Sequence, residues 1–415
     1  MPLKTQAKSS LSNYDLEDLL PRWLQTAYTT SHIQSALTTL DEREDARIKA
    51  KSKAAAEAIS SHLHSSDSTF DSLESINFYS IASGALPVNQ QRNRYMDVLP
   101  YDRTRVKIKV PHLGGNPGSV HNHLSGDDES EGLYLNANWV QEKYGKKWWI
   151  ASQAPLRNTA YTFLSLLLED MYPPSLSHSA TSTSSNPSSH HSRPRTVVQL
   201  TQNVESGGRK AHPYFPDVVG QTMIIVPDIT DYPSDSDSDH YGDSYDSSSS
   251  SSIHRKPKSS RSKTYPAIRF THLLFVAWPD HSVPSPSDRA ALFEFVRLVD
   301  RVNRQMPFDD SDVDVDPPII VGCSAGIGRT GSFIAMNSLL RHAGFLPPPA
   351  TIYNSHTPVV GPLGPLPTSL SADLVSQEID SLREQRAGMV QRPEQAVLVY
   401  EMMVGAYVER GELKR

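Results

Sequence analysis

The chain has 415 residues, with 40 Lys and Arg against 46 Asp and Glu and a formal net charge of -6. This balance gives no basic footprint for nucleic acid or for an anionic membrane surface, so both kinds of partner are disfavoured. A single cysteine excludes an intramolecular disulfide framework and fits a reducing compartment, the cytoplasm or the nucleus. Since the sequence lacks a secretory signal and an apolar stretch of bilayer length, we expect an intracellular protein without membrane insertion.

We expect one sizeable domain with additions, because the long polar stretches of this chain cannot contribute to a core. Residues 16–60 have a helical pattern, so residues 1–76 are expected to form an N-terminal helical extension packed on a main domain at 77–412. Four segments have too few apolar residues to offset the entropy lost on ordering, and we expect flexible insertions there. They are residues 113–131, 173–195, 232–263 and 347–368.

Short runs of β-branched or aromatic residues alternate with helical patterns along the main domain. Strands interleaved with helices predict an α/β fold with a mixed central sheet flanked by helices. The expected strands lie at 106–110, 148–150, 196–200, 223–226, 268–278 and 319–321, and the expected helices at 159–171, 288–305, 332–342, 372–386 and 393–409.

The densest chemical signal follows the last of these strands, where five residues separate Cys323 from Arg329 and an apolar helix follows at once. Backbone amides turned inward by such a loop, together with the positive end of the helix, form a nest for a phosphate dianion. Arg329 adds a planar fork for two phosphate oxygens. The same field stabilises a thiolate. A lone cysteine is more often a buried small hydrophobe, but three glycines in the loop and Thr330 favour a nucleophile here.

The run SAGIGRTG at 324–331 resembles the signature of the protein tyrosine phosphatase family, and further similarity follows in order over residues 77–410. The resemblance implies a highly twisted sheet and hydrolysis of phosphotyrosine in protein substrates through a phosphocysteine intermediate, without a metal or other cofactor. It also implies that Arg329 binds the phosphate and that the Thr330 hydroxyl stabilises the departing thiolate. The phosphate-binding backbone would be that of Ser324, Ala325, Gly326, Ile327 and Gly328.

Two further motifs carry expected catalytic groups. The run Trp278, Pro279, Asp280 resembles the mobile acid loop of the family, which implies Asp280 as the general acid that protonates the phenolate, with the two preceding residues in support. Gln391 and Gln395 resemble the glutamine loop of the family. The resemblance implies that the Gln391 amide orients the attacking water and that Gln395 belongs to the substrate site.

Two other matches concern specificity and support. Tyr95 and Asp97 resemble the phosphotyrosine loop, where the ring would stack on the substrate and the carboxylate would hold its backbone. A pocket walled by an aromatic ring is deep, which excludes the shorter phosphoserine. Glu205 and Lys210 match a loop whose Glu anchors Arg329 and whose Lys contacts the acid loop.

One departure from the family pattern concerns the residue before the nucleophile, which is Gly322 in place of the usual His. That imidazole helps to hold the loop and to ionise the thiol, so we expect slower turnover here. A weak or inactive phosphotyrosine-binding pseudophosphatase is therefore one alternative. A dual-specificity or phosphoinositide phosphatase is another, although the absence of Lys between Cys323 and Arg329 disfavours a highly anionic headgroup.

Overall fold

The computed structural model describes residues 18–60, 78–108, 133–174, 192–225, 268–280, 282–305, 314–351 and 361–412, with side chains of the first segment described to residue 54. The expected insertions at 113–131 and 232–263 lie outside these residues, as do most of 173–195 and the middle of 347–368. The described flanks of the last segment contact the rest of the molecule. Arg304 donates to Pro348 O at 2.7 Å, and Arg43 donates to Gly364 O at 2.7 Å.

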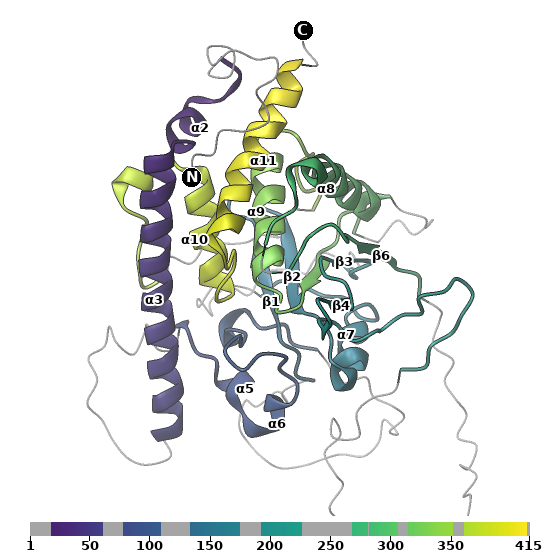
Figure 1. Ribbon diagram of the computed structural model, residues 1–415. Coiled ribbons are helices and arrows are strands. Elements are labelled where there is room, and N and C mark those ends of the chain that lie inside the picture. The colour runs from purple at the N-terminus through teal and green to yellow at the C-terminus, as the bar shows by residue number, and fades with distance from the viewer. Residues whose placement is uncertain are drawn as a thin grey trace, which may run out of the picture.

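A five-stranded mixed sheet forms the centre of the molecule (Figure 1). Its strands lie in the order β1-β2-β7-β3-β6, and only the pair β1 and β2 is antiparallel. Their bounds are β1 Ala137–Gln141, β2 Trp148–Gln153, β7 Ile319–Cys323, β3 Thr196–Gln199 and β6 Thr271–Leu274. The expected α/β fold with a mixed sheet is therefore confirmed.

Alternate residues of the strands contribute to two separate apolar clusters, so the sheet is covered on both faces. Trp149, Ile319 and Val321 belong to the larger cluster, with residues of the C-terminal helices. Ile150 and Ile320 belong to the smaller one, with residues of α7 (Ala160–Ser165). The strand β7 is central and buried on both faces, which explains its uninterrupted apolar run. It leads into residues 323–329, which we call the catalytic loop.

The helices of the second half of the chain contribute to the larger cluster: α8 (Arg289–Arg304), α9 (Gly328–His342), α10 (Leu374–Gln385) and α11 (Pro393–Glu412). The helix α9 packs on β7 and contacts α10 and α11 (Figure 1). Its residues 328–341 are all buried. The helix that follows the catalytic loop is thus fixed along its whole length.

The N-terminal segment shares this core. Leu24 of α2 (Arg22–Ala27) and Leu40 of α3 (Thr30–Ser60) are buried in the same apolar cluster as residues of α9 and α11. The long helix α3 contacts α10 and stands beside it in Figure 1. The remaining elements are α5 Ala82–Ala85, α6 Pro87–Gln90, β4 Val204–Glu205, β5 Gly208–Arg209 and the 3₁₀ turns η1 Asp102–Thr104, η2 Arg157–Thr159, η4 Pro286–Asp288 and η5 Thr368–Leu370.

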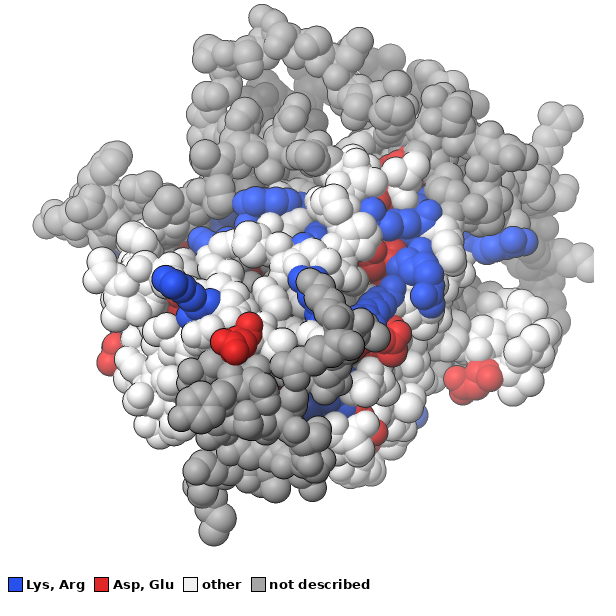
Figure 2. Space-filling view, turned by 90° about the horizontal axis from the view of Figure 1, so that it is seen from above, with Lys and Arg blue, Asp and Glu red and all other residues white. Residues whose placement is uncertain are grey.

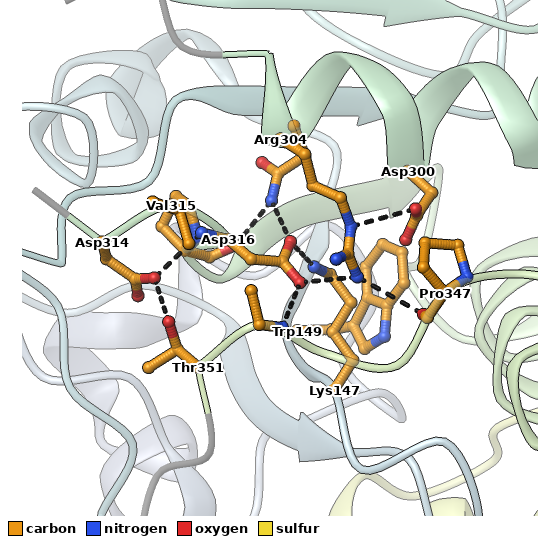
Figure 3. Close-up of polar contacts among 12 residues, drawn as sticks. Lys147, Trp149, Asp300, Arg304, Asp314, Val315, Asp316, Pro347 and Thr351 are labelled. Carbon is orange, nitrogen blue, oxygen red and sulfur yellow. Dashed lines mark hydrogen bonds and ion pairs between the residues drawn. The ribbon is translucent and has the colours of Figure 1, made fainter.

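A buried ionic network closes the end of the sheet opposite to Cys323 (Figure 3). Lys147 precedes β2 and forms an ion pair with Asp316, which precedes β7. Arg304 of α8 contacts the same carboxylate at 2.9 Å. Burial of this network is compatible with stability because each charge has an opposite partner. It ties the starts of the two central strands to α8.

Several expected elements differ from the structure. The expected strand at 106–110 forms only isolated bridges, at Arg105 and Ile108, within its described part. The described part of 223–226 forms no strand, and Ile224 is 86% exposed. The strand at 268–278 is reduced to β6, and the helix expected at 159–171 is reduced to α7. Among the described residues, no helix is both long and apolar enough to cross a membrane.

Candidate active site

Cys323 is the last residue of the central strand β7, and its side chain is only 5% exposed. The loop that follows turns directly into α9. Parallel neighbours on both sides hold the end of β7, since Gly322 pairs with Ser152 of β2 and with Gln199 of β3. The position of the thiol is therefore set by the sheet.

The carbonyl groups of the loop point outward, and four of them accept hydrogen bonds from the body of the protein. The contacts are Ala154 N to Ser324 O at 3.0 Å, Arg386 Nη2 to Ala325 O at 3.0 Å, Arg386 Nε to Gly326 O at 2.9 Å and Val390 N to Ile327 O at 3.2 Å. The N–H and C=O of a trans peptide point in opposite directions. The amides of residues 325–328 therefore face the concave side of the loop, where they form an anion nest.

Glycine is required at one turn of this loop. Gly326 has φ +71°, and a Cβ atom there would lie 2.2 Å from the backbone oxygen of Ser152. Both the backbone conformation and the close approach to β2 exclude any larger residue. The residue thus lets the loop lie directly on the neighbouring strand.

Arg386 supports the loop from behind and was not among the residues that the sequence singled out. Its guanidinium is 1% exposed and holds two loop carbonyls, and it also donates to Asn136 at 2.9 Å and to Asn138 at 2.6 Å. Burial lowers the pKa of Arg386 to about 10, which the negative charge of Cys323 partly opposes. A signal was present in the sequence, because two asparagines at a spacing of two in a core strand require a buried polar partner.

Arg329, which lies six residues after Cys323, is 3% exposed, and its guanidinium is held in place by several hydrogen bonds. It forms a bidentate pair with Glu205, at 2.8 and 2.7 Å, and donates to Leu200 O at 2.9 Å. Burial opposes its charge, but the hydrogen bond with Glu205 raises the pKa of Arg329, helped by the charges of Cys323 and Asp280. The guanidinium is therefore cationic and pre-oriented.

Asp280 lies at the catalytic loop, with Oδ1 2.7 Å from Arg329 Nη2 and the other oxygen paired with Lys210. The hydrogen bond with this carboxylate raises the pKa of Lys210. The buried Trp278 donates from Nε1 to Ser282 O at 3.0 Å across the turn that contains the exposed Pro279. The structure thus brings Asp280, Arg329, Glu205 and Lys210 together.

Tyr95 stands at the rim of the loop, and its hydroxyl lies 2.9 Å from Ser324 Oγ, which also donates to Lys210 O at 3.0 Å. Asp97 is exposed, with a backbone oxygen that accepts from Lys51 of α3 at 3.0 Å. The phenol of Tyr95 therefore contacts the loop, whereas the only described hydrogen bond of Asp97 is through its backbone.

The two glutamines and Thr330 differ in their surroundings. Gln391 is exposed, whereas Gln395 is 2% exposed, packs against Gly328 and accepts from Arg392 N at 3.1 Å. The Thr330 hydroxyl is buried and has no hydrogen-bond partner among the residues that the structure describes. An unsatisfied buried hydroxyl at the start of α9 requires a physical reason, and a charged sulfur or phosphate in the loop would supply one.

Gly322, the departure from the family pattern, also has a steric cause. A Cβ atom at this position would lie 2.7 Å from Ser152 O, closer than real contacts allow. Beside it, a small cavity is lined by Gly322, Cys323, Gln199 and Tyr214, among others. Gln199 is 5% exposed and accepts from the Tyr214 hydroxyl at 3.1 Å. Gln199 of β3 therefore lies beside Gly322, the position at which β7 has no side chain.

A family model described as "Protein-tyrosine phosphatase" matches residues 89–172 and 190–345, more than half of the chain. The chain belongs to the protein-tyrosine phosphatase family. The matched residues include Tyr95, Glu205, Asp280, Cys323 and Arg329, whereas the glutamine loop lies beyond them.

Relatives within the family include receptor and non-receptor proteins. Receptor-type tyrosine-protein phosphatase eta of Gallus gallus is 31% identical over 258 residues, 61% of this chain and 14% of the relative. Tyrosine-protein phosphatase non-receptor type 4 of Homo sapiens is 26% identical over 78% of this chain and 26% of the relative. A solved structure titled "Structural basis of PTPN18 fingerprint on distinct HER2 tyrosine phosphorylation sites" has a TM-score of 0.46 and 20% identity, and covers 79% of this chain and 87% of that chain. This chain thus spans about a seventh to a quarter of the length of these two curated phosphatases.

Proposed function

We propose that this chain is a protein tyrosine phosphatase that hydrolyses phosphotyrosine in protein substrates through a phosphocysteine intermediate on Cys323. The observation that carries the proposal is the loop geometry. Carbonyls bound on the outside leave the amides of residues 325–328 on the concave side, next to a buried thiol. Arg329, fixed by Glu205, completes a cradle for a dianion.

In the first step, the Cys323 thiolate attacks phosphorus and a sulfur–phosphorus bond forms while the bond to the phenolic oxygen breaks. The electron pair of that bond goes to the phenolic oxygen, which takes a proton from Asp280. Asp280 contacts Arg329 at 2.7 Å. A bound phosphate oxygen replaces this carboxylate on the guanidinium, and the acid group is then free to face the leaving oxygen.

In the second step, water attacks phosphorus and the sulfur–phosphorus bond breaks, with inorganic phosphate as product. Asp280 takes the proton from the water, and Gln391 orients the water. The Thr330 hydroxyl, which is buried without a partner among the described residues, donates to the departing thiolate.

Specificity for phosphotyrosine arises at the rim of the site. Tyr95 is held upright by Ser324, so its ring would stack on the substrate ring and deepen the pocket. Asp97 is exposed and would accept from the backbone of the substrate. Gln395 packs against Gly328 and supports the loop from the α11 side.

We also propose a domain organisation and a cellular compartment for this protein. We place the catalytic domain at residues 77–412 and its helical extension at 1–76. A thiolate nucleophile requires a reducing compartment, which favours the cytoplasm, with the nucleus as a second site.

The test begins with Cys323→Ser, which is expected to abolish hydrolysis of a phosphotyrosine peptide while the peptide still binds. Because Cys323 is the only cysteine of the sequence, alkylation by iodoacetate should occur at one site and should be blocked by phosphate. Retained turnover in Cys323→Ser would overturn the proposal. Wild-type turnover near zero over a broad pH range would identify a pseudophosphatase, and equal rates on phosphoserine or phosphoinositide would identify the dual-specificity alternative.

The role of Asp280 is tested through the leaving group. Asp280→Ala should slow hydrolysis of phenyl phosphate much more than hydrolysis of p-nitrophenyl phosphate, because p-nitrophenolate departs without protonation. Asp45→Ala, at an exposed site on α3, is the matched control and should behave like the wild type. An equal loss on both substrates would contradict a role as general acid.

A further inference from the structure

The helix α3 reaches the active site through a loop that joins α10 to α11. This loop, residues 386–392, presents Gln391, the residue placed above at the water. Glu44 of α3 accepts a hydrogen bond from Gly388 N at 2.9 Å. A carboxylate from the N-terminal extension therefore binds the backbone three residues before Gln391.

A second connection runs through Arg383 of α10, which is 5% exposed. Its guanidinium donates to Met389 O and Val390 O, each at 2.9 Å, and to Leu40 O of α3 at 2.8 Å. One side chain thus links the loop backbone to the backbone of α3. The loop is held from its outer side at three consecutive residues.

The conformation of this loop depends on such contacts. Val390 has φ +55°, in the left-handed region that a β-branched residue rarely adopts. A residue of this kind costs about 1–3 kcal/mol and persists only where the surroundings fix it. Val390 N also donates to Ile327 O of the catalytic loop at 3.2 Å. The strained residue is therefore clamped between the catalytic loop on one side and Arg383 on the other.

Glu44 is itself fixed by two cations. Arg47, which is 0% exposed, contacts its carboxylate at 3.3 Å, and Arg383 Nε lies 3.9 Å from it. Arg47 is anchored in turn by Asp380 and Glu384 of α10, the latter at 2.7 Å. The acceptor for Gly388 N is thus pre-oriented, as an effective positioning group must be.

We infer that Glu44 is a positioning residue for the second step of the reaction. It holds the backbone at Gly388 so that Val390 keeps its left-handed conformation and Gln391 faces the water beside the phosphocysteine. The inference rests on the proposed function. Glu44 has no described hydrogen bond or ion pair with residues 323–329 or with Arg386, and its loop meets the cradle through Arg386 and through Val390 N and Ile327 O. Loss of the Glu44 contact is therefore expected to act mainly on attack by water, because Arg386 and Val390 keep their own hydrogen bonds to the cradle.

The experiment is rapid mixing of the full chain with p-nitrophenyl phosphate, with release of nitrophenol as the signal. In Glu44→Ala, the burst rate should equal that of the wild type, whereas the steady-state rate should fall about tenfold, the effect of one charge-assisted hydrogen bond. Acid quenching should find phosphocysteine on a larger fraction of the chains. In Glu44→Gln, which keeps the acceptor oxygen, most of the steady-state rate should return.

Glu42→Gln is the matched control, since Glu42 is exposed on the same helix, and it should behave like the wild type. Burst and steady-state rates that fall together in Glu44→Ala, or unchanged rates in both Glu44 variants, would overturn the inference while leaving the proposed function intact. If Glu44→Ala does not fold, the comparison of Glu44→Gln with Glu42→Gln decides, because a small selective loss in the steady-state rate is still expected there. Absence of phosphocysteine and of turnover in the wild type would instead overturn the proposed function and the inference with it.

Discussion

At residue 322, the main chain of this phosphatase leaves no room for a side chain. The nearest atom to a Cβ would be the Ser152 backbone oxygen on β2, which cannot rotate away as a side chain could. The family histidine therefore cannot be restored by a single substitution. The pairing of β7 with β2 and the missing imidazole are thus two aspects of one local geometry, in which Gln199 and Tyr214 line the cavity beside Gly322.

Gly322→Ala is expected to lower the free energy of unfolding by about 1–3 kcal/mol, the usual cost of an overpacked site. It should also lower kcat, because β2 or the catalytic loop must shift. Thermal unfolding and steady-state hydrolysis measure the two effects. The control is Gly405→Ala in α11, where a Cβ meets nothing within 4 Å. That change should leave kcat unaltered and raise stability slightly, because Ala is the better helix former.

His272 predicts a pH dependence of stability. Burial lowers the pKa of His272 to about 4, whereas the unfolded chain has the ordinary value of about 6.5. A depressed pKa contributes stability that is present above the unfolded value and is lost as the pH falls toward the folded value. Between pH 7 and pH 5, the loss should approach about 2 kcal/mol.

Urea unfolding at these two pH values measures this loss. In His272→Gln the difference between the two pH values should shrink by the same amount, whereas His342→Gln, at an exposed position on α9, should leave it unchanged. Equal pH dependence in His272→Gln and the wild type would assign the acid sensitivity to other groups.

At the scale of elements, the end of α10 supports the catalytic loop. Arg386 reaches two loop carbonyls and two asparagines of the segment around β1 with one planar group. Arg386→Lys should lower kcat/KM by about a hundredfold, since a single ammonium cannot satisfy this fork and the loop carbonyls lose their donors. Phosphate titration should weaken in parallel. Arg301→Lys, exposed on α8, is the control and should not differ from the wild type.

The elements that the sequence predicts well are those whose pattern reflects direct burial. The run at 319–321 is buried on both faces of the sheet, and the helix patterns at 288–305, 372–386 and 393–409 correspond closely to α8, α10 and α11. The strand β1 was not predicted, because Asn138 interrupts its apolar pattern to bind Arg386. The strand predicted at 223–226 was wrong over its described part, where Ile224 is exposed to solvent instead of being buried in a sheet.

The residues of the candidate site also divide into those that the sequence predicts and those that only the structure reveals. The chemistry of the catalytic loop is visible in its residue types, whereas the acid loop and the phosphotyrosine loop were predicted from their resemblance to short motifs of the family. Contacts such as Glu44 with Gly388 join residues 344 positions apart, and their existence depends on the packing of α3. No local pattern could specify them.

At the scale of the whole molecule, the N-terminal extension and the sheet form one core. Leu40 is 2% exposed and lies in the same cluster as residues of α9 and α11. Leu40→Ala should destabilise the entire chain by about 2–5 kcal/mol and preserve a single unfolding transition. Hydrogen exchange should show α3 and α10 losing protection together. Ile48→Ala, 46% exposed on the same helix, should have little effect, and separate transitions for α3 and the sheet would contradict a shared core.

The surface of the described residues carries charges of both signs. On the face seen in Figure 2, basic and acidic side chains of the described residues lie interspersed. Among the described residues, Arg297 forms ion pairs with both Glu294 and Glu409. Mixed charge of this kind produces no long-range field of one sign. Under the proposed function, recognition of the substrate then depends on Tyr95 and Asp97.

Arg386 is a buried cation that binds two carbonyl groups of the catalytic loop. Its hydrogen bonds within the described residues are all to neutral oxygen atoms, and negative charge at Cys323, followed by Tyr134, favours its cationic form. Exchange of the Cys323 sulfur for a hydroxyl would therefore remove a counter-charge of this buried cation together with the proposed nucleophile. A dianion in the loop then takes over the missing negative charge. Phosphate and other oxyanions should therefore bind the folded form of a Cys323→Ser variant, so that its free energy of unfolding rises with the oxyanion concentration.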